Sequence, residues 1–524
     1  MMQDLIDELS RPDAYPHPVG DVEVCQTHIS VVFLAGDYAY KLKKPLDLGF
    51  VDYSTLARRR HFCEREVTLN ERLAPDVYLD VVAICGNGRR RVELHGDADD
   101  VVEWAVRMRR LDDSHTLLRR LEEGRVDDGI FEQVGRRLAR FHEDARGGDD
   151  IDEAITFDRV RQNALDNFEQ SRHHVGEVVD EAVFERVERL TRRRLTEQAP
   201  LICRRARNGV ARDTHGDLRL EHVYLDDDGE LFVVDCIEFN DGFRFADPVC
   251  DISFLAMDLG IRGYDEGARR LLDAYFDARD DREGRDLVDF YVAYRSCVRA
   301  KVHGFKAGEE EVPADQRRRA QRKGRAHWLY ALSRLEPAGK GPALLMLAGL
   351  PAAGKSTLGR RLVEKGGADL LIESDVVRKE LAGLNPGDDA DAEVGRGIYT
   401  PEFTQRTYAE VARRVEAEIC RGRRVAVAAT FVRDEHRKMM VGVAGKLGVP
   451  VHFLECRIDD DEAHRRLQAR VDDVSDAGVE VYEALKERWE SPSPEVARVH
   501  QVVDTTSSKT PDHGDEDHGH HQKE

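Results

Sequence analysis

The segment Gly349–Thr357 constrains this chain more than any other stretch, because it reads G-x-x-x-x-G-K-[ST]. It follows an apolar strand pattern and precedes a helical one, which is the setting that this motif requires. Glycines in such a loop let successive backbone N–H groups curl around a phosphate at a helix N-terminus. The alternative is a glycine-rich strand–helix turn without a ligand. The expected phosphate site comprises Gly349, Leu350, Pro351, Ala352, Ala353, Gly354, Lys355, Ser356 and Thr357.

Within this loop, Lys355 is expected to reach the β- and γ-phosphates of a nucleotide, and Ser356 to hold Mg²⁺. Asp375 follows the next strand pattern, where a carboxylate can accept a proton from a substrate hydroxyl. Arg378, three residues later, could grip a substrate anion. The alternative is that Ser374 and Asp375 only cap a helix, while Arg378 forms a surface ion pair.

Two further arginines, Arg466 and Arg470, lie one turn apart on the same face of a predicted helix. In a P-loop kinase, a pair of this kind closes over the transferring phosphate as a lid. Because the chain is rich in arginine, a solvated helix is the alternative.

The residues from about Leu344 to Asp504 resemble predicted small-molecule kinases of the P-loop superfamily. This is the AAA_33 type, related to gluconate kinases, zeta toxins and polynucleotide 5′-kinases. The resemblance implies that Asp375 is the base and that Arg378 lies on the substrate side. Where the family usually has an Asp that helps hold Mg²⁺ through water, this chain has Ala428, a departure that bears on metal affinity and turnover. The matching motifs are SDVVR (374–378), GIYTPEFTQRTY (397–408), ATF (429–431), HFLECR (452–457), RLQAR (466–470) and SDA (475–477).

Lysine usage marks a second site near the N-terminus. The first three hundred residues contain only Lys41, Lys43 and Lys44, all in one strand pattern, and elsewhere the chain uses arginine. A strand lysine is the usual partner of ATP phosphates, and arginine does not replace it. Glu64 or Glu66 in the following helical pattern could orient such a lysine. The alternative is three exposed edge-strand lysines that discourage aggregation.

A His-Gly-Asp segment with Asp217 is followed by Asp235 at the end of an apolar strand pattern. This order of a strand lysine, an HGD loop and a strand-end Asp is the base-plus-metal arrangement of protein-kinase-like phosphotransferases. Asp217 would accept the hydroxyl proton and Asp235 would hold Mg²⁺. The alternative is that both aspartates only satisfy backbone N–H groups in turns.

Residues 20–305 resemble the aminoglycoside phosphotransferase/choline kinase-like family, and more narrowly proteins that fuse such a domain to a P-loop kinase. The resemblance implies that Lys41 is the ATP lysine, that Glu66 is its partner and that Arg107-Met108 lies near the nucleotide hinge. The family's H-G-D-x-x-x-x-N motif ends here in His222 instead of the Mg²⁺-binding Asn. The neutral imidazole of His222 can still ligate a metal ion in this position. Because Mg²⁺ prefers oxygen ligands, reduced Mg²⁺ affinity or use of Mn²⁺ is expected. The carrying motifs include HGDLRLEHV (215–223), DCIEFND (235–241) and DPVCDISFL (247–255).

These patterns predict an α+β protein-kinase-like bilobal domain over residues 1–337, with a helical linker over about 308–337. An α/β P-loop NTPase domain with a parallel sheet is predicted over 338–505, and a disordered His/Asp-rich tail over 506–524. Strand patterns at 21–28, 29–35, 38–43, 78–85, 91–94 and 104–111 surround one helix that begins after a cap at Ser54. A short helix is expected at 327–335. C-terminal strands are expected at 344–348, 370–372, 424–428 and 451–456.

The function that follows is ATP-dependent transfer of the γ-phosphate to hydroxyls of small molecules at two sites. The net charge of −22 disfavours nucleic acid as a partner, and no apolar run is long enough to span a bilayer. Nine scattered cysteines without a C-x-x-C pair indicate reduced thiols in the cytoplasm. Two alternatives stay open: the C-terminal domain is a polynucleotide 5′-hydroxyl kinase, or one domain only binds nucleotide and regulates the other.

Overall fold

The computed structural model describes residues 2–49, 51–86, 91–93, 100–127, 129–226, 229–385, 397–469 and 478–506. The contacts divide the chain into two compact units, which are Met1–Gln170 with Thr191–Val298, and Ser171–Leu190 with Arg299–Glu524. The first unit has an antiparallel sheet with helices and the second a five-stranded parallel sheet, so the predicted fold class is confirmed. Of the predicted features, Arg470, the SDA motif at 475–477 and the tail from residue 507 lie outside the described residues.

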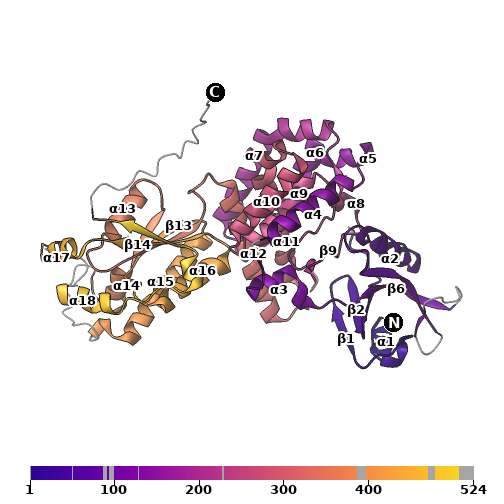
Figure 1. Cartoon of the computed structure of the whole chain (residues 1–524), viewed down its shortest axis with the longest axis horizontal. Coiled ribbons are helices and arrows are strands. Elements are labelled where there is room, and N and C mark those ends of the chain that lie inside the picture. Colours follow the sequence, from indigo (N-terminus) through magenta and orange to yellow (C-terminus); the bar gives the residue numbers. More distant parts are fainter. Residues whose placement is uncertain are drawn as a thin grey trace. The chain divides into compact units, whose positions relative to one another are not determined.

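A six-stranded antiparallel sheet forms the start of the first unit, in the order β1-β2-β3-β6-β4-β5. Figure 1 labels three of its strands, β1, β2 and β6. Alternating side chains build it: β3 places Tyr40 and Leu42 on the side that packs into an apolar core. Lys41 pairs across the sheet with Val32 on one side and Val106 on the other, so β3 is a central strand. The strands are β1 (Val22–Gln26), β2 (Ser30–Ala35), β3 (Tyr38–Lys43), β4 (Tyr78–Cys85), β5 (Arg91–Glu93) and β6 (Val101–Arg109).

Helix α2 (Leu56–Asn70) is the one helix expected among these strands, and it contacts β4 and β6. Its N-cap is Thr55, whose hydroxyl accepts a hydrogen bond from the N–H of Arg58 at 3.3 Å. The prediction of Ser54 as the cap is therefore wrong by one residue. The Ser54 hydroxyl instead donates to Asp52, which closes the turn before the helix.

The rest of the first unit is mainly helical, with two short ribbons, β7 (Arg212–Asp213) with β10 (Phe245–Ala246) and β8 (Val223–Leu225) with β9 (Leu231–Val233). Gly135 of α4 allows a close crossing, because a Cβ there would lie 2.5 Å from the carbonyl oxygen of Leu271 in α10. The helices before residue 309 are α1 (Met2–Leu9), α3 (Leu117–Glu122), α4 (Ile130–Asp144), α5 (Asp149–Asp152), α6 (Phe157–Ser171), α7 (Glu181–Arg207), α8 (Asp241–Arg244), α9 (Pro248–Gly260), α10 (Asp265–Arg279) and α11 (Val288–Gly308). The contacts assign the first part of α7, up to Leu190, and the last part of α11, from Arg299, to the second unit.

The second unit contains a parallel sheet in the order β12-β13-β11-β14-β15. Helices lie on both faces of this sheet (Figure 1). Four of its strands match the expected ones, and β15 at the edge was not predicted. The strands are β11 (Ala343–Ala348), β12 (Leu370–Glu373), β13 (Arg424–Ala428), β14 (Val451–Arg457) and β15 (His500–Asp504). The helices after the first strand are α13 (Lys355–Glu364), α14 (Ser374–Leu381), α15 (Pro401–Cys420), α16 (Asp434–Leu447), α17 (Asp460–Gln468), α18 (Val479–Glu487) and α19 (Pro494–Ala497).

The segment expected to link the domains contains one long helix, α12 (Ala314–Leu335), so the short helix predicted at 327–335 is only its last part. The charged first half of α12 is mostly exposed, and its apolar second half is buried. Trp328 is fully buried and meets the ring of Phe184 edge-on at 5.2 Å. The contacts thus group α12 with the parallel sheet in the second unit. The domain ranges themselves stay predictions about independent folding.

Candidate functional site

Lys41 and Lys43 point to the same side of β3, and both meet a glutamate from α2. The Nζ atom of Lys41 lies 2.7 Å from Oε1 of Glu66, and that of Lys43 lies 2.7 Å from Oε2. Glu66 is fully buried, whereas Glu64 is exposed and pairs with Arg60 on the surface. Of the two glutamates that the sequence left open, only Glu66 contacts the lysines. The alternative of exposed edge-strand lysines is wrong for Lys41 and Lys43.

Lys43 belongs to a buried network that the sequence did not reveal. Its ammonium forms a very short contact with Glu238, and the hydroxyl of Tyr53 donates to the same carboxylate at 2.5 Å. Burial lowers the pKa of Lys43, but Glu238 and Glu66 outweigh it and hold the pKa well above its ordinary value. Lys43 is therefore a charged residue inside the fold, whereas the side chain of Lys41 is 16% exposed.

Lys41 also reaches Asp235, the carboxylate at the end of the β9 segment. The distance from Nζ to Oδ1 is 2.7 Å. Asp235 has a φ of 65°, a left-handed conformation that non-glycine residues adopt rarely and that often marks functional positions. The N–H of Asp235 donates to the hydroxyl of Tyr78 at 3.0 Å, which helps fix this conformation. Burial raises the pKa of Asp235, but the charge of Lys41 outweighs it and brings the pKa far below its ordinary value.

A buried carboxylate, Asp251, anchors the backbone of the HGD loop. Asp251 of α9 accepts hydrogen bonds from the N–H groups of His215, at 3.0 Å, and Gly216, at 2.9 Å. His142 of α4 lies 3.1 Å from Asp251 through Nε2 and 2.8 Å from the hydroxyl of Tyr275 through Nδ1. This anchor was not predicted, although Asp251 lies in the DPVCDISFL motif. It fixes the backbone that carries Asp217.

Asp217 does not stand alone at the end of this loop. Arg219 grips its carboxylate, with Nε 3.1 Å from both oxygens and Nη2 2.9 Å from Oδ2. His222, in the slot where the family motif has Asn, is 3.7 Å from Asp217 Oδ2 and 3.6 Å from Asp235 Oδ2. The structure thus brings the predicted residues Lys41, Glu66, Asp217, His222 and Asp235 into one cluster.

We expect this unit to lose stability as the pH falls below 6.5. Burial lowers the pKa of His215 to about 4, and the charge of Asp251 opposes this shift only in part. Between pH 6.5 and 4 the unfolded chain binds a proton at this position that the folded chain does not. The free energy of unfolding therefore falls with decreasing pH, by about 1.4 kcal/mol per pH unit for one such histidine. Urea unfolding followed between pH 7.5 and 5 measures this slope.

The control for that measurement is His215→Gln, which keeps an amide donor toward the carbonyl of Val234, now 3.0 Å from Nε2 of His215. In this variant, the free energy of unfolding should depend on pH less steeply, by about 1.4 kcal/mol per pH unit. An equal slope in both proteins would contradict the assignment to His215.

The phosphate loop of the second unit has the backbone that its sequence predicts. Gly349 has a φ of 140°, Ala352 of 64° and Gly354 of 82°, and helix α13 begins directly after Gly354. At Gly349 a Cβ would lie 2.5 Å from the carbonyl oxygen of Cys456, so only glycine fits there. Nζ of Lys355 donates to the carbonyl of Leu350 at 2.9 Å, which holds the lysine over the loop. Ser356 and Thr357 follow in the first turn of α13.

Arg466, predicted as a lid residue, lies against this loop. Its guanidinium donates to the carbonyls of Ala352 at 3.4 Å, Thr505 at 3.1 Å and Thr506 at 3.0 Å. The hydroxyl of Thr505 donates to the carbonyl of Ala353 at 2.8 Å, so the chain after β15 also borders the loop. Thr505 was missed because nothing in its local sequence relates it to residues 350–356. Arg470 lies outside the described residues.

Arg378 is buried, so the alternative of a surface ion pair is wrong. It donates to the carbonyl of Ile398 at 2.8 Å and to the hydroxyl of Thr404 at 3.1 Å, and its guanidinium lies over the ring of Tyr399. These contacts tie α14 to the GIYTPEFT motif. Asp375 lies in the first turn of α14, whose N-cap is Glu373 without a side-chain cap bond.

Ala428 ends β13 at the position where the family usually has Asp. It packs with Leu345 and Leu347 in an apolar cluster beneath α13. In the sheet it is paired with Leu347 on one side and Glu373 on the other. The carboxylate nearest in register is therefore Glu373, which faces Arg360 at 3.4 Å.

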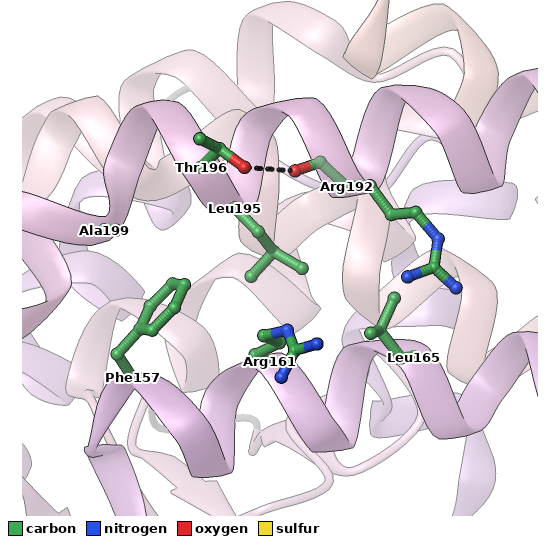
Figure 2. A pocket seen from close by; sticks show the side chains of 7 residues that line it. All are labelled: Phe157, Arg161, Leu165, Arg192, Leu195, Thr196 and Ala199. Carbon is green, nitrogen blue, oxygen red and sulfur yellow. Dashed lines mark hydrogen bonds between the residues drawn. The ribbon is translucent and has the colours of Figure 1, made fainter.

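A cavity of about 340 Å³ lies between α6 and α7 (Figure 2). Apolar side chains and the two guanidiniums of Arg161 and Arg192 line it, as Figure 2 shows. Its lining includes no predicted site residue among those described, and it offers no carboxylate to act as a base. We therefore place the candidate sites at the two clusters above. Among the described residues, no helix is long and apolar enough to cross a membrane.

Known proteins resemble this chain over almost its whole length. The AAA_33 family, described as an AAA domain, matches residues 344–492. The chain is 32% identical over 477 residues to the uncharacterized protein Rv2004c of Mycobacterium tuberculosis (strain ATCC 25618 / H37Rv), covering 90% of this chain and 91% of the relative. The uncharacterized protein Mb2027c of Mycobacterium bovis matches with the same values.

Two solved structures are similar to separate parts of the chain. A choline/ethanolamine kinase family protein from Mesorhizobium loti is 15% identical, covers 64% of this chain and 96% of that protein, and has a TM-score of 0.39. A sugar kinase from Janibacter sp. HTCC2649 is 15% identical, covers 31% of this chain and 84% of that protein, and has a TM-score of 0.24.

Proposed function

The chain belongs to the family of the mycobacterial protein Rv2004c, and from that premise we propose that it is an ATP-dependent phosphotransferase with two kinase sites. Each site transfers the γ-phosphate of ATP to a hydroxyl group of a small molecule. The observation that carries the proposal is the cluster of Lys41, Glu66, Asp235 and Asp217 in one unit, together with a complete phosphate loop in the chain's other unit. We infer a reducing, cytoplasmic setting from the nine cysteines, which form no disulfide with one another in the described part of the chain.

At the N-terminal site, Glu66 holds Lys41 so that its ammonium can bind the ATP phosphates. Asp217, on the loop that Asp251 anchors, accepts the proton of the acceptor hydroxyl. The hydroxyl oxygen forms a bond to the γ-phosphorus as the bond from that phosphorus to the bridging oxygen breaks. ADP leaves with the electron pair of the broken bond.

At the C-terminal site, the backbone N–H groups of the loop and Lys355 bind the phosphates, and Asp375 accepts the hydroxyl proton. Arg466 already borders the loop and would close on the transferring phosphate, with Arg378 on the acceptor side. Asp235 in the first site and the Ser356 hydroxyl in the second offer the oxygen atoms that Mg²⁺ prefers. Bound Mg²⁺ would neutralise the charge that develops on the phosphates.

The decisive experiment is γ-phosphate transfer from labelled ATP in a pooled metabolite extract, with products resolved by mass. Asp217→Ala and Lys355→Ala should each remove a different product. One shared loss would mean a single reaction. A parallel reaction with a short 5′-hydroxyl oligonucleotide tests the polynucleotide alternative, which labelled oligonucleotide would support.

We expect Ala428→Asp to strengthen metal binding at the C-terminal site. The new carboxylate would stand where the family supports Mg²⁺ through water, and outer-sphere ligands of this kind change metal affinity by 10-fold or more. The Mg²⁺ concentration for half-maximal formation of the Lys355-dependent product should fall about 10-fold. Ala428→Asn, with the same shape and no charge, is the matched control. An equal effect of both variants would contradict a role for the carboxylate.

A second function, nucleotide binding without turnover in the C-terminal domain, is favoured by one observation. Ala428 places an apolar methyl group where a metal-supporting carboxylate is expected. A regulatory domain of this kind binds ATP tightly and yields no Lys355-dependent product.

A further inference from the structure

The ring of His222 has no nitrogen available for a metal ion. Its Nδ1–H donates to the carbonyl oxygen of Asp217 at 2.8 Å, and its Nε2 accepts from Nη2 of Arg219 at 2.9 Å. One neutral tautomer satisfies both contacts, because a ring nitrogen facing a guanidinium must act as the acceptor. The residue that replaces the family's metal-binding Asn is thus fully engaged by its own loop.

Arg219 stands among the acidic groups that a second metal ion would otherwise bring together. Its guanidinium contacts the carboxylate of Asp217, Nε2 of His222 and, very closely, the carboxylate of Glu221. The side chain is only 15% exposed. Because a guanidinium keeps its proton under all ordinary conditions, it is a fixed positive charge at this point.

The rest of the site can still accept one ion. Oδ1 of Asp235 pairs with Lys41, whereas its Oδ2 lies 3.6 Å from Nε2 of His222. The side chain of Asp235 is 46% exposed. Within the described ranges, no group of three or more His, Cys, Asp or Glu side chains is arranged to hold a metal. Protein kinases use two Mg²⁺ ions, one on the strand-end Asp and one on the catalytic-loop Asn. In this chain Asp235 can hold the first ion, whereas the loop has no oxygen ligand in place of Asn for the second.

We propose that Arg219, positioned by His222, replaces the second metal ion of the N-terminal site, which therefore takes a single divalent ion through Asp235. This inference rests on the proposed kinase function of that site. The fixed guanidinium supplies positive charge beside Asp217 without depending on the metal concentration, and His222 serves as a positioning residue rather than a ligand.

The test counts Mn²⁺ bound per chain by electron paramagnetic resonance, with a saturating non-hydrolysable ATP analogue. The parent protein is the full chain with Lys355→Ala, and all variants are compared with it, so that ions bound elsewhere cancel. Asp235→Asn should lose one Mn²⁺. The double variant Arg219→Ala/His222→Asn should gain one, because it restores an oxygen ligand and frees Asp217. Arg219→Lys, which keeps a charge, should gain none.

The proposal is overturned if Asp235→Asn loses two ions, or if the double variant binds the same number as its parent. Circular dichroism confirms that each variant is folded before ions are counted. Affinity for a fluorescent ATP analogue separates the two hypotheses. If Lys41→Ala does not weaken nucleotide binding in the parent, the kinase assignment of this site fails. If Lys41→Ala weakens nucleotide binding but the double variant binds as many ions as its parent, only the proposal that Arg219 replaces the second metal ion fails.

Discussion

Replacing Asp217 with Asn lowers kcat for the N-terminal product by about 10²–10⁴-fold, the usual contribution of a general base. The amide keeps the shape of the side chain but cannot accept the hydroxyl proton. Because Asp251 and not Asp217 anchors the loop backbone, we expect the fold and the affinity for ATP to change little. Initial rates of the purified full chain with the identified acceptor, at saturating ATP, measure the effect.

The matched control is Asp375→Asn, which should leave that product unchanged and lower the C-terminal product by a similar factor. Glu221→Gln controls for altered charge in the loop, since Glu221 contacts Arg219 but is placed at the surface. If Asp217→Asn retains more than a tenth of the parent kcat, Asp217 is not the base.

Replacing Lys43 with Met should lower the free energy of unfolding by about 3–5 kcal/mol, because it leaves a buried carboxylate without its counter-charge. Glu238 is 5% exposed, and its other partner here is the neutral hydroxyl of Tyr53. Glu66 still pairs with Lys41 in this variant, so the loss of Lys43 costs it less than Glu238. Chemical denaturation followed by tryptophan fluorescence and circular dichroism measures the loss.

Two variants sharpen this prediction. Lys44→Met makes the same substitution at a half-buried lysine that only donates to the carbonyl of Thr27, and it should cost about 1 kcal/mol or less. Lys43→Met/Glu238→Gln removes both charges and should recover much of the loss. A double variant as unstable as Lys43→Met alone would show that packing, rather than charge, gives Lys43 its importance.

The features that the sequence predicted well are local ones. The phosphate loop needs only nine consecutive residues and a strand–helix setting, and the predicted parallel strands are short, largely apolar runs. β15 escaped prediction because its sequence, HQVVD, alternates poorly and lies at the sheet edge. Two adjacent hydroxyl residues, Ser54 and Thr55, could each cap the helix. The Ser54 hydroxyl bonds to Asp52 in the preceding turn, so Thr55 is the cap.

The features that were missed depend on contacts between residues far apart in the chain. Glu238 meets Lys43 across 195 positions, and Asp251 meets the HGD loop across about 35. Family resemblance placed Lys41 and Glu66 but said nothing of Arg219, because the motif leaves that position open. The hydrogen-bond partners of His222 depend on the path of the loop, which residue types alone do not determine.

The contacts of Thr505 and Thr506 have a practical consequence for anyone trimming the chain. The two carbonyl groups hold the guanidinium of Arg466, and the Thr505 hydroxyl reaches Ala353, so the last described residues form one wall of the phosphate loop. Expression boundaries drawn at the end of β15, which look safe in a topology diagram, would cut that wall away. A shortened protein should therefore keep Thr506 and a few residues after it, and an affinity tag belongs at the other terminus.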